Sequence, residues 1–178
     1  MYKAGVVQAL LDLLLPGNKR RAADSMDPQL KMALITCLSN TAVDSPTVKM
    51  ALASNTGFVS EVFDFVNSEM QSRVIYIVQN LITKDTLQVL YEQGLPNVIM
   101  QLLENTSNGS EIVTLFEIIE KLIDNYKSTL LQLELEKAIR GKLEHSEFLV
   151  RGKAVQLASK LGFALANNNG SFFLLFIY

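Results

Sequence analysis

The chain has 178 residues, of which 49% are hydrophobic and 19% are charged, and its formal net charge is −2. This composition is too apolar for a disordered chain, and the near-neutral charge provides no global attraction to nucleic acid or to acidic membranes. Nine glycines and four prolines are too few for an all-β protein, which needs a turn about every 8–12 residues. The composition predicts an all-α protein, either one compact domain or one short repeat array.

The first apolar helical pattern covers residues 2–15, and a polar insertion, residues 16–27, follows it. The insertion contains the basic run Lys19-Arg20-Arg21. A solvated loop explains these charges, and docking of an acidic partner or a short localisation signal is the alternative. No secretory leader is expected, because no small-residue cleavage site follows an apolar segment.

A helix start is predicted at Asp27 and Pro28, because aspartate caps the first turn and proline fits the first helical position. The apolar stripe of this helix is predicted to be Leu30, Ala33, Leu34, Cys37 and Leu38. Cys37 is the single cysteine, which excludes an internal disulfide and a cysteine-based metal cluster. Its place in the stripe predicts a reduced, buried residue, and a lone free thiol suits a cytoplasmic protein.

Similar signals recur farther along the chain. A second long helix has the apolar stripe Val74, Ile77, Val78 and Leu81. Gly57 and Gly94 are predicted to end short helices, where a left-handed residue turns the chain. Two further helix starts are predicted at Ser110 before Glu111 and at Ser146 before Glu147.

The sequence repeats itself with a period of about 40 residues. Residues 27–66 align with 68–104 so that Asn40 meets Asn80, and a third copy has Lys121 at the same place. The predicted units are 1–26 (partial), 27–67, 68–107, 108–145 and 146–162 (partial), followed by a non-repeat apolar tail, 163–178. Units of this length with helical spacing are typical of α-solenoids, in which neighbouring units stack to share one core. Because the first and last units are partial, we expect a truncated array.

Three stretches resemble the armadillo-repeat family. "KAGVVQALLDLLL" is similar to the first two helices of that repeat, "MALITCLSNTA" to its third helix, and "EQGLPNVIMQLL" to its glycine-containing part. The resemblance implies a right-handed superhelix of three-helix repeats whose third helices line a concave face. Residues 16–27, 57–70 and 142–161 also resemble the later repeats of the SmgGDS-type dissociation stimulators, which implies binding of small GTPases.

In the armadillo family the asparagine of the third helix holds the main chain of an extended partner, since an amide offers both donors and an acceptor. Residues i and i+4 share a helix face. The resemblance therefore implies a partner-binding ladder made of Thr36, Asn40, Tyr76, Asn80, Glu117, Lys121, Gln156 and Lys160. A structural role, in which an asparagine caps a loop or satisfies buried carbonyls, is the alternative. Lys121 and Lys160 depart from the family's asparagine, and the lack of Trp argues against recognition of basic import signals.

No catalytic, cofactor-binding or metal-binding residue is predicted. His145 is the single histidine, in a polar joint where exposure is expected, and no metal-ligand spacing or Gly-rich phosphate loop is present. An acidic surface that attracts the polybasic tails of small GTPases could form from Glu117, Glu120, Glu134, Glu136, Glu144 and Glu147. An ordinary charged helix exterior is the alternative.

These observations predict a cytoplasmic protein-binding adaptor that binds Rho- or Rap-like small GTPases on its concave face and stimulates nucleotide exchange. Such a protein is no enzyme in the covalent sense, because it acts by binding the nucleotide-free partner more tightly than the loaded one. The alternative is a general armadillo scaffold for cytoskeletal, ciliary or signalling assemblies, without an exchange effect. No nucleic-acid partner is expected, because the net charge is −2. No membrane span is expected either, since the seven apolar residues that end the tail are too few to cross a bilayer.

Overall fold

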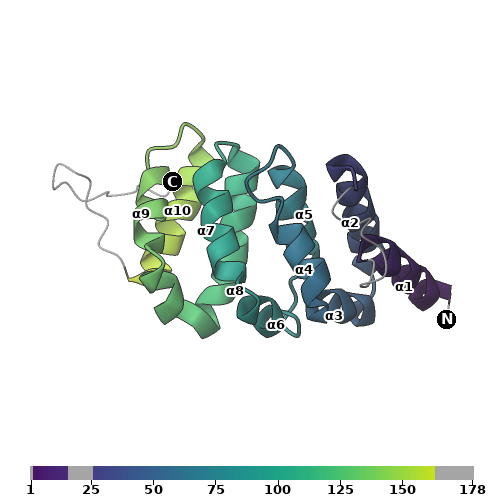
Figure 1. Cartoon of the computed structure of the whole chain (residues 1–178). Coiled ribbons are helices and arrows are strands. Elements are labelled where there is room, and N and C mark those ends of the chain that lie inside the picture. Colours follow the sequence, from purple (N-terminus) through teal and green to yellow (C-terminus); the bar gives the residue numbers. More distant parts are fainter. Residues whose placement is uncertain (1, 16–25, 163–178) are drawn as a thin grey trace. The chain divides into compact units, whose positions relative to one another are not determined.

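The computed structural model of the chain describes residues 2–15 and 26–162, and the regular secondary structure in these ranges is helical throughout (Figure 1). The all-α prediction is confirmed. The helices are α1 (Tyr2–Leu14), α2 (Pro28–Ala42), α3 (Pro46–Ser54), α4 (Thr56–Phe63), α5 (Gln71–Leu81), α6 (Leu87–Glu92), α7 (Leu95–Asn105), α8 (Gly109–Gln132), α9 (Leu135–Lys142) and α10 (Phe148–Leu161). No helix in the described ranges is long and apolar enough to cross a membrane.

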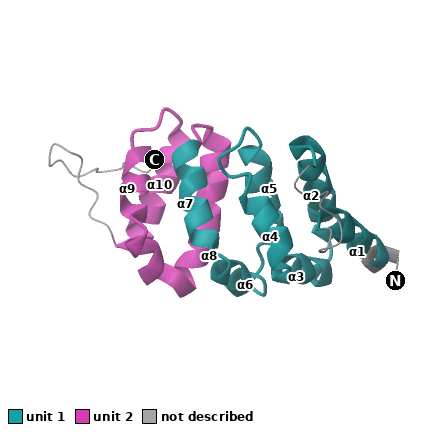
Figure 2. Ribbon diagram, viewed as in Figure 1, with its two compact units in different colours: residues 1–105 teal, residues 106–178 magenta. Residues whose placement is uncertain are grey.

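The chain divides into two compact units, residues 1–105 and 106–178, which we call unit 1 and unit 2 (Figure 2). Unit 1 contains α1 to α7, and unit 2 contains α8 to α10. Within unit 1, the predicted repeat 27–67 contains α2, α3 and α4, and the predicted repeat 68–107 contains α5 and α6 with α7. The basic run at 19–21 and the apolar tail lie outside the described residues.

The start of α2 is confirmed. Asp27 is its N-cap, and the Oδ1 atom of Asp27 accepts hydrogen bonds from the backbone N–H groups of Gln29 (2.9 Å) and Leu30 (3.1 Å). Pro28 occupies the first helical position, where its missing N–H leaves no bond unmade.

The buried face of α2 differs from the predicted stripe. Its buried residues are Met32, Ile35, Leu38, Ser39 and Ala42. Leu30 is 54% exposed, and Ala33 and Cys37 are also exposed. The reason is that α2 carries apolar residues on two adjoining faces, and packing against α1, α3 and α5 selects one of them. The prediction that Cys37 is buried was therefore wrong.

The stripe of α5 is confirmed, because Val74, Ile77, Val78 and Leu81 are all buried. Here a single face of the helix is apolar, and the opposite positions hold polar residues such as Ser72 and Gln79. Helix α5 packs against α2, α3 and α4 with this face. Neighbouring helices α2 and α5 thus belong to one core within unit 1 (Figure 1).

The two glycines predicted to end helices have different roles. Gly94 has φ +93° between α6 and α7, and its N–H donates to the carbonyl of Tyr91 at 3.0 Å, as predicted for a left-handed turn residue. Gly57 instead lies in the first turn of α4, so its predicted role was wrong. A Cβ atom at Gly57 would lie 3.0 Å from Cδ1 of Leu15, so the glycine permits the close approach of this leucine.

The predicted starts of α8 and α10 were also wrong by one or two residues. The N-cap of α8 is Asn108, whose Oδ1 accepts from the N–H groups of Ser110 (3.0 Å) and Glu111 (3.4 Å). The N-cap of α10 is Glu147, whose side chain makes no capping bond. At Ser146 the backbone carbonyl accepts from Nη1 of Arg151 at 2.8 Å.

Replacing Asp27 by Ala removes both capping bonds of α2. We expect the free energy of unfolding to fall by about 1 kcal/mol, measured by urea denaturation. Asp27→Asn is the matched control, because the amide oxygen can still accept both N–H groups. Equal losses in the two variants would contradict the capping role.

Replacing Gly94 by Ala forces a Cβ into a left-handed backbone, and we expect a loss of about 1 kcal/mol or more in the free energy of unfolding. The control is Gly152→Ala in the middle of α10, where no atom lies within 4 Å of the added Cβ and where alanine favours the helix by about 1 kcal/mol. A Gly94→Ala protein as stable as the unmodified chain would refute the assignment.

Candidate functional site

Helices α2 and α5 of unit 1 form the two sides of an open groove with a volume of about 820 Å³. The lining residues are Ala33, Thr36, Cys37, Asn40 and Thr41 from α2 and Ser72, Arg73 and Tyr76 from α5. The groove thus contains Thr36, Asn40 and Tyr76 of the predicted ladder, whereas Asn80 is not among its lining residues. The position of the groove follows from the orientation of α2, since the exposed face of that helix borders α5.

Asn40 and Tyr76 are exposed, and they contact each other across the groove. The Tyr76 hydroxyl donates to Oδ1 of Asn40 at 3.4 Å, which is a long and weak hydrogen bond. The Tyr76 residue is 46% exposed. Because the amide oxygen accepts this bond, the Nδ2 group of Asn40 keeps its two donors for another molecule.

Asn80 has different surroundings. It is partly buried, and its Nδ2 donates to the hydroxyl oxygen of Ser39 at 3.4 Å. Ser39 is fully buried, and a buried hydroxyl without a partner is unfavourable. The bond between Asn80 and Ser39 therefore joins α5 to α2, which agrees with the structural alternative for this asparagine.

The hydroxyl groups of the two groove threonines donate to their own helix. Oγ1 of Thr36 donates to the Met32 carbonyl at 2.8 Å, and Oγ1 of Thr41 donates to the Leu38 carbonyl at 2.7 Å. Arg73 is exposed, and among the described residues its guanidinium has no hydrogen-bond or ion-pair partner. The strong N–H donors of the groove that have no partner among the described residues are those of Asn40 and Arg73.

Arg73 and Cys37 were not among the predicted site residues. Each lies three residues before a predicted one, Arg73 before Tyr76 and Cys37 before Asn40. Residues i and i+3 share a helix face, so this spacing could have identified both. Cys37 was missed because the predicted apolar stripe includes it, and Arg73 because the predicted ladder consists of i and i+4 pairs and leaves out the i+3 spacing.

The four predicted residues of unit 2 are exposed on α8 and α10: Glu117, Lys121, Gln156 and Lys160. Lys160 is held in an ion pair, since its Nζ lies 2.9 Å from Oε1 of Glu120. Nζ of Lys153 lies 3.8 Å from the other carboxylate oxygen of Glu120. Glu120 therefore joins two lysines of α10 to α8, and Lys160 contributes to packing within unit 2.

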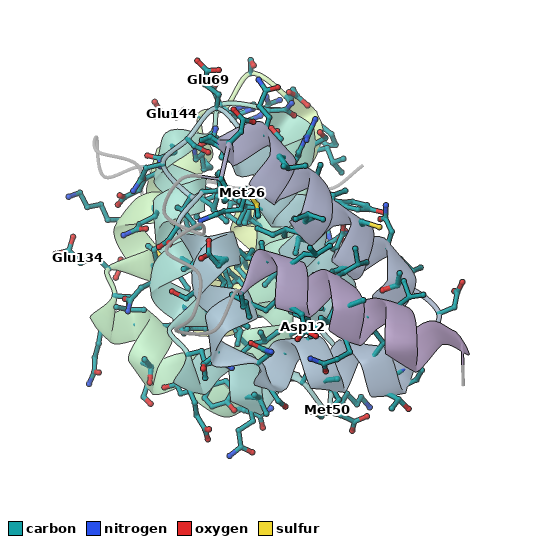
Figure 3. All side chains as sticks on the ribbon, turned by 45° about the vertical axis from the view of Figure 1, so that its right-hand side comes forward. Asp12, Met26, Met50, Glu69, Glu134 and Glu144 are labelled. Atoms are coloured by element: carbon teal, nitrogen blue, oxygen red, sulfur yellow. The ribbon has the colours of Figure 1, made fainter. Side chains whose placement is uncertain are left out.

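The acidic side chains of unit 2 are in large part paired. Glu136 lies 2.7 Å from Nη2 of Arg140, and Glu134 lies 3.6 Å from Nζ of Lys137. The carboxylate of Glu147 occupies the space beside Gly109 at the N-terminus of α8, where the helix dipole favours negative charge. Glu134 and Glu144 extend outward from the helices (Figure 3). These pairs favour the ordinary charged exterior over an acidic binding surface.

His145 has a structural place in the joint between α9 and α10. Its Nδ1 accepts from the N–H of Glu147 at 3.1 Å, so its proton lies on Nε2, which is 3.4 Å from the Ser107 carbonyl. Lys142 donates to the Thr106 carbonyl at 3.1 Å. Burial lowers the pKa of the Lys142 ammonium below its ordinary value. Among the described residues no group of three or more His, Cys, Asp or Glu side chains could hold a metal ion.

Comparisons with protein families, with curated proteins and with solved structures find no match for this chain.

Replacing Asn80 by Ala leaves the buried hydroxyl of Ser39 without its partner, so we expect a loss of about 1 kcal/mol in the free energy of unfolding. Asn40→Ala is the matched control, and its exposed position predicts a change within about 0.5 kcal/mol. Urea denaturation of the Ser39→Ala, Asn80→Ala and double variants gives the coupling energy, expected at about 0.5 kcal/mol or more. Strictly additive losses would show that the bond contributes nothing.

Proposed function

We propose that this chain is an armadillo-type adaptor that binds a protein partner through the groove between α2 and α5. The observation that carries the proposal is the pair Asn40 and Tyr76, which is exposed, joined across two helices and placed in an open groove. An exposed amide at this position can pair with the main chain of an extended segment whatever its sequence. Tyrosine is enriched at binding hot spots because it combines an apolar ring with a polar tip.

The packing of α2 against α5 supports the assignment of these helices as equivalent members of successive repeats. They share one core, and the aligned positions 40 and 80 lie on helices that touch. In this proposal both helices take the place of the third helix of an armadillo repeat, and the groove is part of the concave face. The asparagine of the earlier repeat binds the partner, while that of the later repeat joins the two helices.

Binding fits the groove better than catalysis does. The strongest nucleophile among its lining residues is the Cys37 thiol, which needs an adjacent base to act in covalent catalysis. The single histidine of the chain, His145, belongs to unit 2 and has Nδ1 engaged by the backbone of Glu147 and Nε2 facing the Ser107 carbonyl. A groove of small, polar and aromatic side chains with one cation is instead typical of a surface that recognises a peptide segment.

The partner class we propose is the Rho- or Rap-like small GTPases, with acceleration of GDP release as the consequence of binding. The support is the resemblance of residues 16–27, 57–70 and 142–161 to the SmgGDS-type stimulators. A protein that binds the nucleotide-free GTPase more tightly than the loaded form shifts the equilibrium toward release without chemistry of its own. A scaffold that binds without this preference is the alternative outcome.

The proposal is tested by GDP release from a panel of purified Rho- and Rap-like GTPases, followed with a fluorescent GDP analogue. We expect faster release with the unmodified chain and a loss of about tenfold in partner affinity for the Asn40→Ala/Tyr76→Ala double variant, because one hot-spot contact contributes about 1–2 kcal/mol. Circular dichroism before the assay verifies that the variant is folded.

Cys37 supplies a second readout, because it is the single cysteine and lies exposed in the groove. A bulky maleimide on Cys37 should block binding, whereas Cys37→Ser treated with the same reagent should bind normally. If the chain binds a GTPase without accelerating GDP release, the result supports the scaffold function instead of nucleotide exchange. If no GTPase binds, or if the blocked protein binds as well as the free one, the proposal fails.

A further inference from the structure

The hydrogen bonds within the α2/α5 groove decide what kind of partner group it can accept. Thr36 and Thr41 direct their hydroxyl protons to their own helix, and the Tyr76 hydroxyl proton goes to Oδ1 of Asn40. Those bonds use the three hydroxyl protons and one of the two lone-pair sites of the amide oxygen. The strong N–H donors for which the described residues supply no partner are Nδ2 of Asn40 and the guanidinium of Arg73, so the strongest groups that the groove offers are matched by acceptors on a ligand.

The charge of the groove points in the same direction. Arg73 is the one charged side chain among the lining residues that the structure describes, and it is exposed. Lys31 of α2 differs from Arg73, because its Nζ lies 2.6 Å from Oε2 of Glu61 in an ion pair. A free guanidinium presents parallel N–H groups that match a carboxylate in a bidentate pair. Recognition of phosphate generally uses a cluster of arginines, and this groove contains one.

We propose that the segment entering this groove is extended and acidic. An Asp or Glu carboxylate of the partner pairs with Arg73, and a main-chain carbonyl of the same segment accepts from Nδ2 of Asn40. The proposal rests on the proposed function in that it uses the same groove, and it names the chemistry of the bound segment. It also assigns any polybasic tail to some other surface, because a lysine-rich segment would be repelled by Arg73.

The test uses a library of random peptides displayed on phage and selected against the full chain. Protein that carries a bulky maleimide on Cys37 serves for counter-selection, so that the retained peptides are those that need the groove. We expect enrichment of Asp and Glu. For a selected peptide, fluorescence anisotropy should show an affinity about threefold to tenfold lower for Arg73→Gln than for the unmodified protein.

Two controls separate the Arg73 contact from bulk charge. Lys84→Gln makes the same change in net charge at an exposed site of unit 1 that does not line the groove, and it should leave the affinity unchanged. Arg73→Glu should reverse the preference, so that the same peptide with Lys in place of its acidic residue binds better than the original.

Each result of these binding experiments either supports the acidic-segment proposal or overturns it. The proposal is overturned by enrichment of basic peptides, by acidic peptides that bind Arg73→Gln unchanged, or by the absence of any peptide that the Cys37 block displaces. A phosphoserine in place of the acidic residue that binds more than about tenfold tighter would reassign the groove to phosphopeptides. Acidic peptides that bind at Arg73, together with no effect on any GTPase, would overturn the GTPase proposal and leave this one standing.

Discussion

The rotation of α2 about its own axis is the constraint on which the groove depends. Met32, Ile35 and Leu38 point into the core of unit 1 and have 0% exposure. Burial of each such side chain stabilises the fold by roughly 1.5–3 kcal/mol, so turning the helix to bury its other face would be strongly unfavourable. Because the core holds this face inward, Cys37 and Asn40 must face outward beside α5. The buried residues of α2 thus determine which of its other side chains line the groove.

The bond between Ser39 and Asn80 follows from the same rotation. Ser39 lies next to Asn40 in the sequence, yet it is buried while its neighbour is exposed. A hydroxyl on the buried face needs a partner, and the amide of the neighbouring helix supplies one. The two asparagines that align in the predicted repeats therefore differ in their surroundings, since Asn80 donates to the buried Ser39 hydroxyl and Asn40 contacts the exposed Tyr76.

Local signals in the sequence predicted several features that depend on one helix alone, although they placed the starts of α8 and α10 one or two residues too late or too early. The α5 stripe has a single apolar face, the Asp27-Pro28 pair acts within one turn, and Gly94 needs only its own backbone angle. Features that depend on a second segment were missed. The need for glycine at position 57 comes from Leu15, which approaches it from another part of the chain. The orientation of α2 is set by the helices packed against it, α1, α3, α4 and α5.

The candidate site shows the same division between local and tertiary information. The resemblance to armadillo repeats, together with the i and i+4 spacing of a helix face, implied that Thr36, Asn40 and Tyr76 share one surface. The sequence alone could not show that the threonine hydroxyls donate to their own helix. It also could not show that no group in residues 2–15 or 26–162 pairs with the Arg73 guanidinium. Those facts depend on rotamers and on which helices touch, and they give the groove its preference for acceptors.

The reactivity of the Cys37 thiol in the folded protein shows which face of α2 is buried, because the chain has a single cysteine. Because Cys37 is exposed, we expect it to react rapidly with a small aromatic disulfide reagent under native conditions, at a rate close to that of the same chain in denaturant. A thiol that reacts only as the protein unfolds would show that α2 buries its other face. In that case Asn40 would no longer face the groove, and the proposed binding surface would not exist.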